Sequence, residues 1–109
     1  MKSHVYLVDE KLRITYDNLK TSTGENKLLY KWLSRAMDDL AQNSFCGIHI
    51  QKKLIPKEYV KKYDIDNLWK YDLPIGWRLI YTIKKEEVLV VSIILEWFDH
   101  KEYDRRFGY

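Results

Sequence analysis

Three observations predict that this chain folds as a single α+β domain. Its 109 residues are close to the modal size of one domain and are enough to build one hydrophobic core. The N-terminal half contains a long segment with the apolar period of an amphipathic helix, and the C-terminal half contains three strand-like segments joined by short turns. A helix followed by consecutive strands is typical of helices packed on an antiparallel sheet. We therefore treat residues 1–109 as one domain.

The first elements of the chain are predicted less sharply than the later ones. Residues His4 to Val8 fit a short strand. From Lys11 to Asn18, apolar and polar residues alternate as in a strand, yet Leu12, Tyr16 and Leu19 also fit one stripe of a helix. Periodicity alone leaves both structures open for this segment.

A long amphipathic helix is predicted from Glu25 to Gln42. Thr23 and Gly24 supply a start signal, and the pair Asn43-Ser44 supplies a stop signal. Its apolar residues recur at intervals of three and four: Leu28, Leu29, Trp32, Leu33, Ala36, Met37 and Leu40. This stripe is expected to face the core.

The middle of the chain carries a basic segment and a short helix. The segment from Gly47 to Ile55 contains Lys52 and Lys53. Pro56 suits the first turn of a helix that would extend to Tyr63, because proline lacks the amide donor that a first turn leaves unused.

The C-terminal half is predicted to form an antiparallel meander. The strands are expected at Leu68–Leu73, Trp77–Lys84 and Val88–Phe98, with the last one central because it is apolar on both faces. Side chains alternate between the two faces of a strand, so the residues that should face the long helix are Trp69, Tyr71, Leu73, Trp77, Leu79, Tyr81 and Ile83. The same alternation places Lys70, Asp72 and Arg78 together on the opposite, open surface.

Composition excludes several classes of protein. Hydrophobic residues make up 46% and charged residues 32%, with four glycines and two prolines, which excludes collagen-like and disordered chains. The longest apolar run, from Val88 to Leu95, is far shorter than the roughly 20 residues that cross a bilayer. The first residues lack a signal-peptide pattern, so we expect a cytoplasmic protein. A net charge of +3 is too mild to indicate nucleic-acid binding by itself.

The cysteine and glycine content excludes further kinds of site. Cys46 is the single cysteine, so it cannot form an internal disulfide, and between Phe45 and Gly47 it is expected to be a small buried hydrophobe. The three histidines are far apart and show no metal-ligand spacing, and no glycine-rich phosphate loop is present. We therefore expect no metal site, and we expect the protein to be neither a nucleotide hydrolase nor a dinucleotide-dependent enzyme.

The densest group of polar residues lies at the C-terminal end, from Asp99 to Arg106. His100 has acids and cations close by in the sequence, so it can titrate near neutral pH and move protons. By composition alone, a solvated charged tail is the more common outcome for such a segment. The residues leave both interpretations open.

Three strings in the second half of the chain resemble the RelE/ParE toxin superfamily. They are Leu68-Trp69-Lys70-Tyr71-Asp72-Leu73, Gly76-Trp77-Arg78-Leu79-Ile80-Tyr81, and His100-Lys101-Glu102-Tyr103-Asp104 after an apolar strand. The last string is most similar to HigB-type members. The resemblance implies a RelE-like fold, with two N-terminal helices packed on a small, twisted, mainly antiparallel sheet, and it favours a helix from Asp9 to Lys20.

The resemblance also implies an activity and partners. Many members are the toxins of type II toxin-antitoxin systems: metal-independent endoribonucleases that cut mRNA in the ribosomal A site and are silenced by a co-produced antitoxin protein. In this reaction the ribose 2'-hydroxyl attacks the adjacent phosphorus and leaves a 2',3'-cyclic phosphate and a free 5'-hydroxyl. No cofactor is required, and the expected partners are the antitoxin, mRNA and the ribosome.

The family's active residues can be carried over at four positions, and a fifth position departs from the family's pattern. Arg78 matches the phosphate-binding arginine, and its planar guanidinium suits two phosphate oxygens. Lys70 matches a basic position on the preceding strand, whereas Asp72 stands where other members carry a second lysine, so it is either a carboxylate base or an ion-pair partner. His100 matches the histidine that opens the terminal motif and is expected to act as general acid or base. Tyr103 matches a tyrosine that could stack on a base or donate to the phosphate.

Further cations could hold RNA by charge. Lys101, Arg105 and Arg106 are expected to contact the RNA backbone, and Lys52 and Lys53 are expected to contact ribosomal RNA; the alternative is a solvated basic rim. Two other functions fit the same resemblance. ParE-type relatives inhibit DNA gyrase by binding alone, and a non-catalytic member would serve only as an antitoxin-binding protein.

Overall fold

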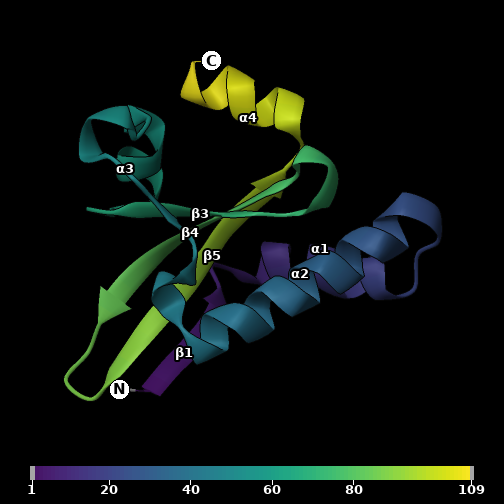
Figure 1. Ribbon diagram of the computed structural model, residues 1–109, viewed down its shortest axis with the longest axis horizontal. Helices are drawn as coiled ribbons and strands as arrows, with labels where there is room; N and C mark the ends of the chain where they lie inside the picture. Colours follow the sequence, from purple (N-terminus) through teal and green to yellow (C-terminus); the bar gives the residue numbers. More distant parts are fainter. Residues whose placement is uncertain (1, 109) are drawn as a thin grey trace.

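The structure is a computed structural model that describes residues 2–108, and it is an α+β fold (Figure 1). The strands are β1 (Lys2–Leu7), β2 (Ile48–Ile50), β3 (Leu68–Asp72), β4 (Arg78–Lys85) and β5 (Leu89–Phe98). The α-helices are α1 (Glu10–Lys20), α2 (Gly24–Gln42), α3 (Lys57–Tyr63) and α4 (His100–Phe107). Three single turns of 3-10 helix connect them: η1 (Ser44–Cys46), η2 (Lys52–Leu54) and η3 (Pro74–Gly76).

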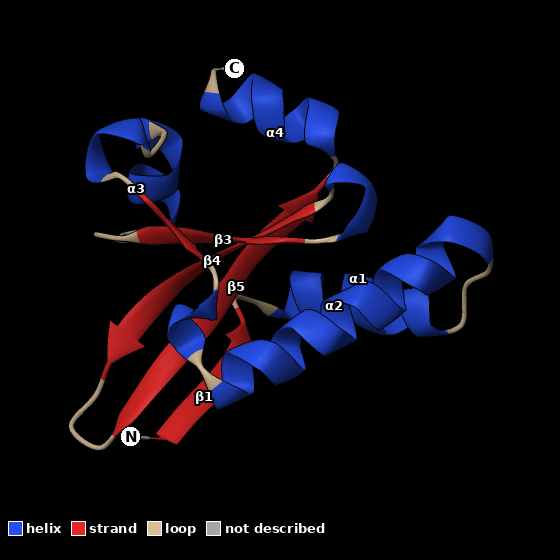
Figure 2. Ribbon diagram, viewed as in Figure 1, coloured by secondary structure: helices blue, strands red, loops and turns tan. Residues whose placement is uncertain are grey.

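Within residues 2–108 the strands form one mixed sheet in the order β1-β5-β4-β3-β2 (Figure 2). The pairs β2–β3, β3–β4 and β4–β5 are antiparallel, and β1 pairs parallel to β5. The predicted meander of β3, β4 and β5 is confirmed, and β5 is an interior strand with a neighbour on each side, in agreement with its apolar character on both faces.

Each face of the sheet is covered by a different pair of helices, as Figure 1 shows. On one face, buried residues of α2 pack against β4 and β5; they are Leu29, Leu33, Ala36 and Leu40 from α2, and Leu79, Tyr81, Ile83, Val90 and Ile94 from the sheet. On the other face, Tyr59 of α3 and Tyr103 of α4 pack on Leu68, Ile80 and Leu95. The sheet is therefore the middle layer, and the side chains opposite α2 meet α3 and α4.

The helices begin and end where their cap residues predict. α1 begins after Asp9, whose side chain accepts a hydrogen bond of 2.8 Å from the amide of Leu12, so the ambiguous segment is a helix. α2 follows Thr23 and ends at Gln42, with Asn43 as its C-cap, close to the predicted bounds. Its stripe faces the core, although Leu28 at its margin is half-exposed.

Cys46 and the C-terminal segment differ in burial from what their local composition favours. Cys46 is exposed, because it ends the turn η1 at the surface beside the likewise exposed Phe45. The segment after Asp99 is not a solvated tail: it forms α4, whose Tyr103 is buried against the sheet. No helix within residues 2–108 has the length and apolar character needed to cross a bilayer.

Candidate functional site

The structure brings Lys70, Asp72 and Arg78 together on the sheet face that carries α3 and α4. Asp72 and Arg78 are directly opposite each other on β3 and β4. One oxygen of Asp72, Oδ1, lies 3.0 Å from Nε of Arg78 and 3.3 Å from Nζ of Lys70. A single carboxylate thus bridges two cations, and this predicted grouping is confirmed.

The surface that these three residues share is not open. The side chains of Lys70 and Arg78 are only 18% and 17% exposed, whereas Asp72 is 47% exposed. Lys70 and Arg78 are therefore largely buried cations that share one carboxylate, and this carboxylate is more exposed to solvent than either cation. Because burial in a low dielectric strengthens charge interactions, such a pair attracts an anion more strongly than two surface cations would.

Arg78 is held by a hydrogen bond from NH1, whereas its Nε donor is not used in a hydrogen bond within residues 2–108. Its NH1 donates to the carbonyl of Trp77 at 3.2 Å. Among the described residues, its buried Nε makes no hydrogen bond, because Asp72 lies close to Nε but off the direction of the N–H bond. The contact with Asp72 is thus an ion pair without a hydrogen bond, and a weaker tie than a bidentate pair.

The aromatic ring of Tyr103 forms the cover over this cluster. Nζ of Lys70 and Cζ of Arg78 each lie 5.2 Å from the centre of the ring, within the range of a cation–π interaction. The ring also stacks on Phe107 at 4.6 Å and is only 5% exposed. In this conformation the buried ring offers no open face to a nucleobase, and donation of its hydroxyl to a phosphate stays a prediction. The ring covers the two cations.

His100 is placed at the start of α4, next to the turn that leads into β4. Gly76 of η3 has a φ of +84°, and a Cβ atom added there would lie 2.9 Å from the Cβ of His100. Glycine is therefore required both by the backbone and by the close approach of His100. Nε2 of His100 lies 3.1 Å from Oδ2 of Asp104, and the imidazole is 61% exposed. Arg78 follows two residues after Gly76, so the fold brings the two proposed catalytic groups to the same end of the sheet.

A second ionic network anchors α4, and the sequence did not indicate it as a unit. NH1 of Arg106 donates to both oxygens of Glu96, at 2.7 and 2.6 Å, and the hydroxyl of Tyr59 donates to Glu96 at 2.6 Å. Glu96 reaches this face because β5 has a bulge: Ile80 pairs with Glu96, but Tyr81 pairs with Ile94. Burial, with the bond to Glu96, raises the pKa of Tyr59 above its ordinary range.

The cations expected to contact RNA lie on different surfaces. Lys101 is exposed on the first turn of α4. Arg105 is exposed but paired with Glu102, and Arg106 is tied to Glu96 and Glu102. Arg106 therefore ties α4 to β5, and its contact with RNA stays a prediction. Lys52 and Lys53 are exposed in η2, and they line a separate groove beside α3.

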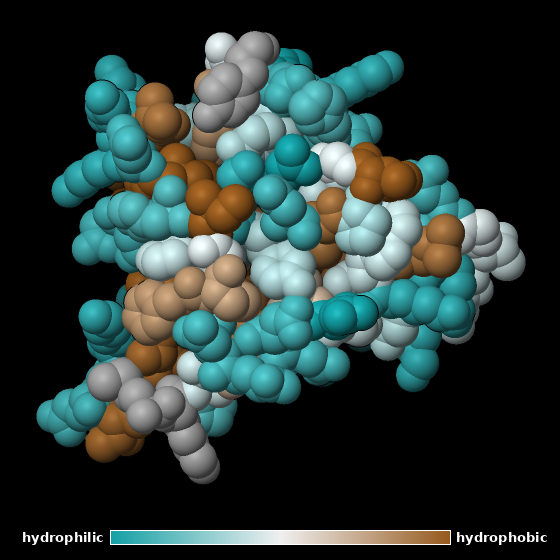
Figure 3. Space-filling model, viewed as in Figure 1, coloured by the Kyte–Doolittle hydropathy of each residue, from teal (hydrophilic) through white to brown (hydrophobic). Residues whose placement is uncertain are grey.

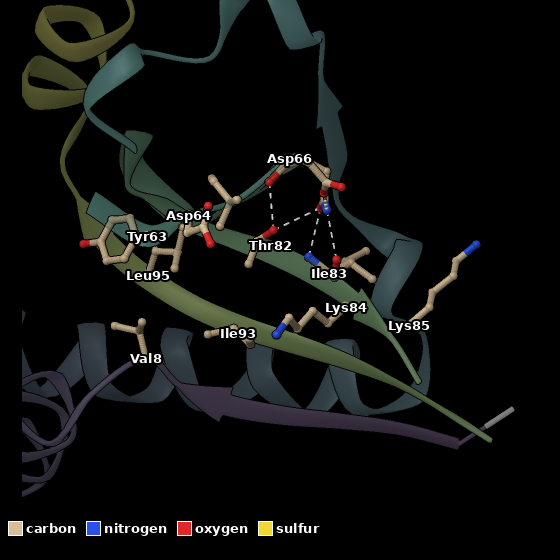
Figure 4. Close-up of a pocket in the computed structure, with 12 residues that line it drawn as sticks. Val8, Tyr63, Asp64, Asp66, Thr82, Ile83, Lys84, Lys85, Ile93 and Leu95 are labelled. Carbon is tan, nitrogen blue, oxygen red and sulfur yellow. Dashed lines mark hydrogen bonds between the residues drawn. The ribbon is translucent and has the colours of Figure 1, made fainter. Parts of the chain in front are cut away.

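The structure also contains a groove that lies apart from this cluster (Figure 4). Its volume is about 560 Å³, and its walls are formed by β4, β5 and the turn before β3. Asn67 closes one side, where its amide group bonds the backbone of Ile83 in both directions at 2.9 Å. All of the predicted site residues lie within residues 2–108, and none of them lines this groove. We therefore place the candidate site at Lys70, Asp72, Arg78 and His100.

Comparison of the chain with models of protein families, with curated proteins and with solved structures finds no match. Within residues 2–108, no group of three or more His, Cys, Asp or Glu side chains is arranged to hold a metal ion. The cluster itself offers two covered cations, one half-exposed carboxylate, and an exposed imidazole at the same end of the sheet.

Proposed function

We propose that this protein is a RelE-like toxin of a type II toxin-antitoxin system, a ribosome-dependent endoribonuclease that cleaves mRNA by attack of the 2'-hydroxyl. The observation that carries the proposal is the pairing of Lys70 and Arg78 around one carboxylate oxygen, at the positions where the resemblance expects the phosphate-binding cations. Phosphoryl transfer places extra negative charge on the phosphate oxygens, and positioned cations lower that energy.

In this proposal Lys70 and Arg78 bind the scissile phosphate. A phosphate group would take the place that the Asp72 carboxylate now occupies, and the buried Nε of Arg78 would gain the hydrogen bond that it lacks. The guanidinium could then donate to two phosphate oxygens, which is the geometry for which arginine is suited.

His100 supplies the proton transfer. The reaction needs a base for the 2'-hydroxyl and an acid for the leaving 5'-oxygen, and an exposed imidazole can serve in either role. Asp104, 3.1 Å away, orients the ring through Nε2 and leaves Nδ1 for the substrate. Asp72 is the alternative base, since it is the carboxylate nearest to the two cations.

The proposal includes an antitoxin and the ribosome as partners. A toxin of this class is silenced by a co-produced protein, and a bound mRNA in the ribosomal A site is its substrate. The exposed Lys101 beside His100 is suited to contact the RNA backbone.

A binding-only function is the second candidate, and a specific observation favours it. Several of the cations expected to meet RNA are already paired with carboxylates: Arg78 with Asp72, Arg105 with Glu102, and Arg106 with Glu96 and Glu102. A protein that inhibits gyrase, or that only binds an antitoxin, would keep this fold without needing free cations at the site.

Primer extension on an mRNA in a reconstituted translation system tests the proposal. Purified protein is added with and without ribosomes, and EDTA is used only in the arm without ribosomes, because ribosomes need Mg²⁺. We expect cleavage only when ribosomes are present, and we expect His100→Ala to abolish it. The absence of cleavage in both arms would contradict the nuclease proposal, and a DNA-supercoiling assay with gyrase would then test the binding-only alternative.

A further inference from the structure

A basic groove with an apolar floor lies between η2 and α3, away from the proposed active site. Its volume is about 640 Å³, and it is lined by Ile55, Val60 and Ile65 together with Lys52, Lys53, Lys57, Lys61 and Asp66. None of its lining residues belongs to the cluster around Arg78. Figure 3 shows apolar side chains among projecting polar ones on the side of the molecule where α3 lies, at the upper left.

The charge of this groove is concentrated and uncompensated. Four lysines and one aspartate give it a net charge of +3, which equals the formal net charge of the whole chain. All four lysines are exposed, and within residues 2–108 none of them makes an ion pair or a side-chain hydrogen bond. By contrast, the arginines of α4 are paired with carboxylates. The groove thus gathers four exposed lysines, none of which is paired with a carboxylate of the described residues, around one cavity.

The floor of the groove is apolar and accessible. Val60 on α3 is half-exposed, and so is Leu54, which precedes Ile55 in the chain. Covering exposed aliphatic side chains with apolar surface of a partner stabilises the complex by roughly 25 cal/mol per Å² of apolar surface buried. A phosphate backbone would pair with the lysines but would leave this floor exposed to water, so the floor favours a polypeptide over RNA.

We infer that this groove binds an acidic, amphipathic segment of a partner polypeptide. Aliphatic or aromatic side chains of the segment would cover Ile55, Val60 and Ile65, and its carboxylates would pair with the surrounding lysines. This arrangement, with apolar anchors in the centre and charges at the rim, is common in peptide-binding grooves. The inference replaces the assignment of Lys52 and Lys53 to ribosomal RNA, and it stands whether or not the protein is a nuclease.

Fluorescence anisotropy with designed peptides tests the inference. The probes are a panel of labelled peptides of about 15 residues, the length of a minimal stable helix. They carry Leu or Phe at helical or alternating spacing with Glu at the other positions, and each has a scrambled counterpart of the same composition. The comparison probes are a poly-glutamate peptide, a single-stranded RNA and vesicles containing phosphatidylserine.

Two groove variants and one matched control are compared by the same assay. Lys57→Glu/Lys61→Glu reverses two charges at the rim, and Val60→Asp places a charge in the floor. Lys11→Glu/Lys31→Glu makes the same change of net charge at two exposed lysines outside the groove. Circular dichroism establishes that each variant is folded, and Lys57→Gln/Lys61→Gln replaces the charge reversal if that variant does not fold.

We expect at least one patterned peptide to bind, and we expect both groove variants to weaken its binding by about tenfold or more. Val60→Asp disrupts the apolar centre of the interface, and the charge reversal makes the rim repel the carboxylates of the peptide. The scrambled peptide should bind weakly, and the control variant should bind like the wild type. The inference is overturned if no patterned peptide binds, if the groove variants leave binding unchanged, or if poly-glutamate, RNA or vesicles bind the groove as tightly. The cleavage assay depends on Arg78 and His100 and not on the groove. Failure of the proposed nuclease function and failure of the proposed peptide binding can therefore be told apart.

Discussion

Asp72 Oδ1 lies 3.0 Å from Nε of Arg78, its direct partner across β3 and β4, without forming a hydrogen bond to it. The same oxygen lies 3.3 Å from Nζ of Lys70. The position between the two cations is therefore held by a carboxylate of the protein itself, and under the proposed function an RNA phosphate would bind there. Asp72 is half-exposed whereas the two cations are covered, so the proposed displacement is that of the carboxylate.

Replacing Asp72 by Asn is expected to tighten RNA binding. The change removes the negative charge that competes with the phosphate, and an ion contact of this exposure is worth about 1 kcal/mol, or roughly fivefold in Kd. Titration of an RNA with a 2'-deoxy sugar at the scissile position measures binding without cleavage. Equal or weaker binding by Asp72→Asn would show that the carboxylate does not compete with the phosphate.

Shortening Leu33 to Ala is expected to lower the free energy of unfolding by about 2 to 5 kcal/mol, because the side chain is fully buried between α2 and the sheet. Leu28→Ala is the matched control: it lies on the same helix but is half-exposed, and it should cost much less. Urea unfolding of both variants measures the difference. Equal losses at the two positions would mean that α2 is oriented differently.

Gly47→Ala is expected to destabilise the fold although Gly47 is not at a strained backbone position. An added Cβ would overlap the hydroxyl of Tyr81 and lie 2.6 Å from the carbonyl oxygen of Lys70. The neighbouring exposed residue provides the control, since Cys46→Ala removes only a surface thiol. Thermal unfolding should show a lower Tm for Gly47→Ala alone, and an unchanged Tm would contradict the close packing of η1 on the sheet.

The ion pairs of α4 predict that the stability of the fold decreases as the pH falls into the acidic range. Hydrogen bonds from Arg105 and Arg106 lower the pKa of Glu102 to about 2, from an ordinary value of 4.5. Between these pH values Glu102 binds a proton in the unfolded chain and not in the folded chain. The stabilisation of the fold by the ion pairs of Glu102 is therefore complete above about pH 4.5 and is lost as the pH falls toward 2. The Tm difference between the wild type and Glu102→Gln should narrow over that range. A constant difference would refute the assignment, and Glu86→Gln, at an exposed turn, serves as the control.

Much of the fold can be predicted from the sequence because the signals are local. Residue spacing identifies α2, and alternation places Lys70, Asp72 and Arg78 on one face, since β3 and β4 are joined by the tight turn η3 and their register follows. Asp9 acts as the N-cap of α1, but the alternating pattern beside it concealed the helix.

The burial of Lys70 and Arg78 under α4 was not predictable, because it depends on packing between segments that are distant in the sequence. The bulge in β5 places Glu96 on the face of α3 and α4, where it binds Arg106, and a two-residue period cannot reveal such an irregularity. The charged composition of residues 99–106 conceals the apolar side of α4, which rests mainly on Tyr103 and Phe107. As a result the sequence predicted the cations but not their burial.

The most direct test of the account is the single-turnover rate of mRNA cleavage on programmed ribosomes for the wild type, Arg78→Lys, Arg78→Ala and His100→Ala. Arg78 is covered, so Arg78→Lys keeps the charge and most of the packing while it removes the planar donor pair. His100 is exposed, so its replacement should leave the Tm unchanged. We predict cleavage by the wild type, a rate reduced by about a hundredfold or more in Arg78→Lys, and none detectable in the two alanine variants. Cleavage by folded His100→Ala or Arg78→Ala at the wild-type rate would contradict the proposed site.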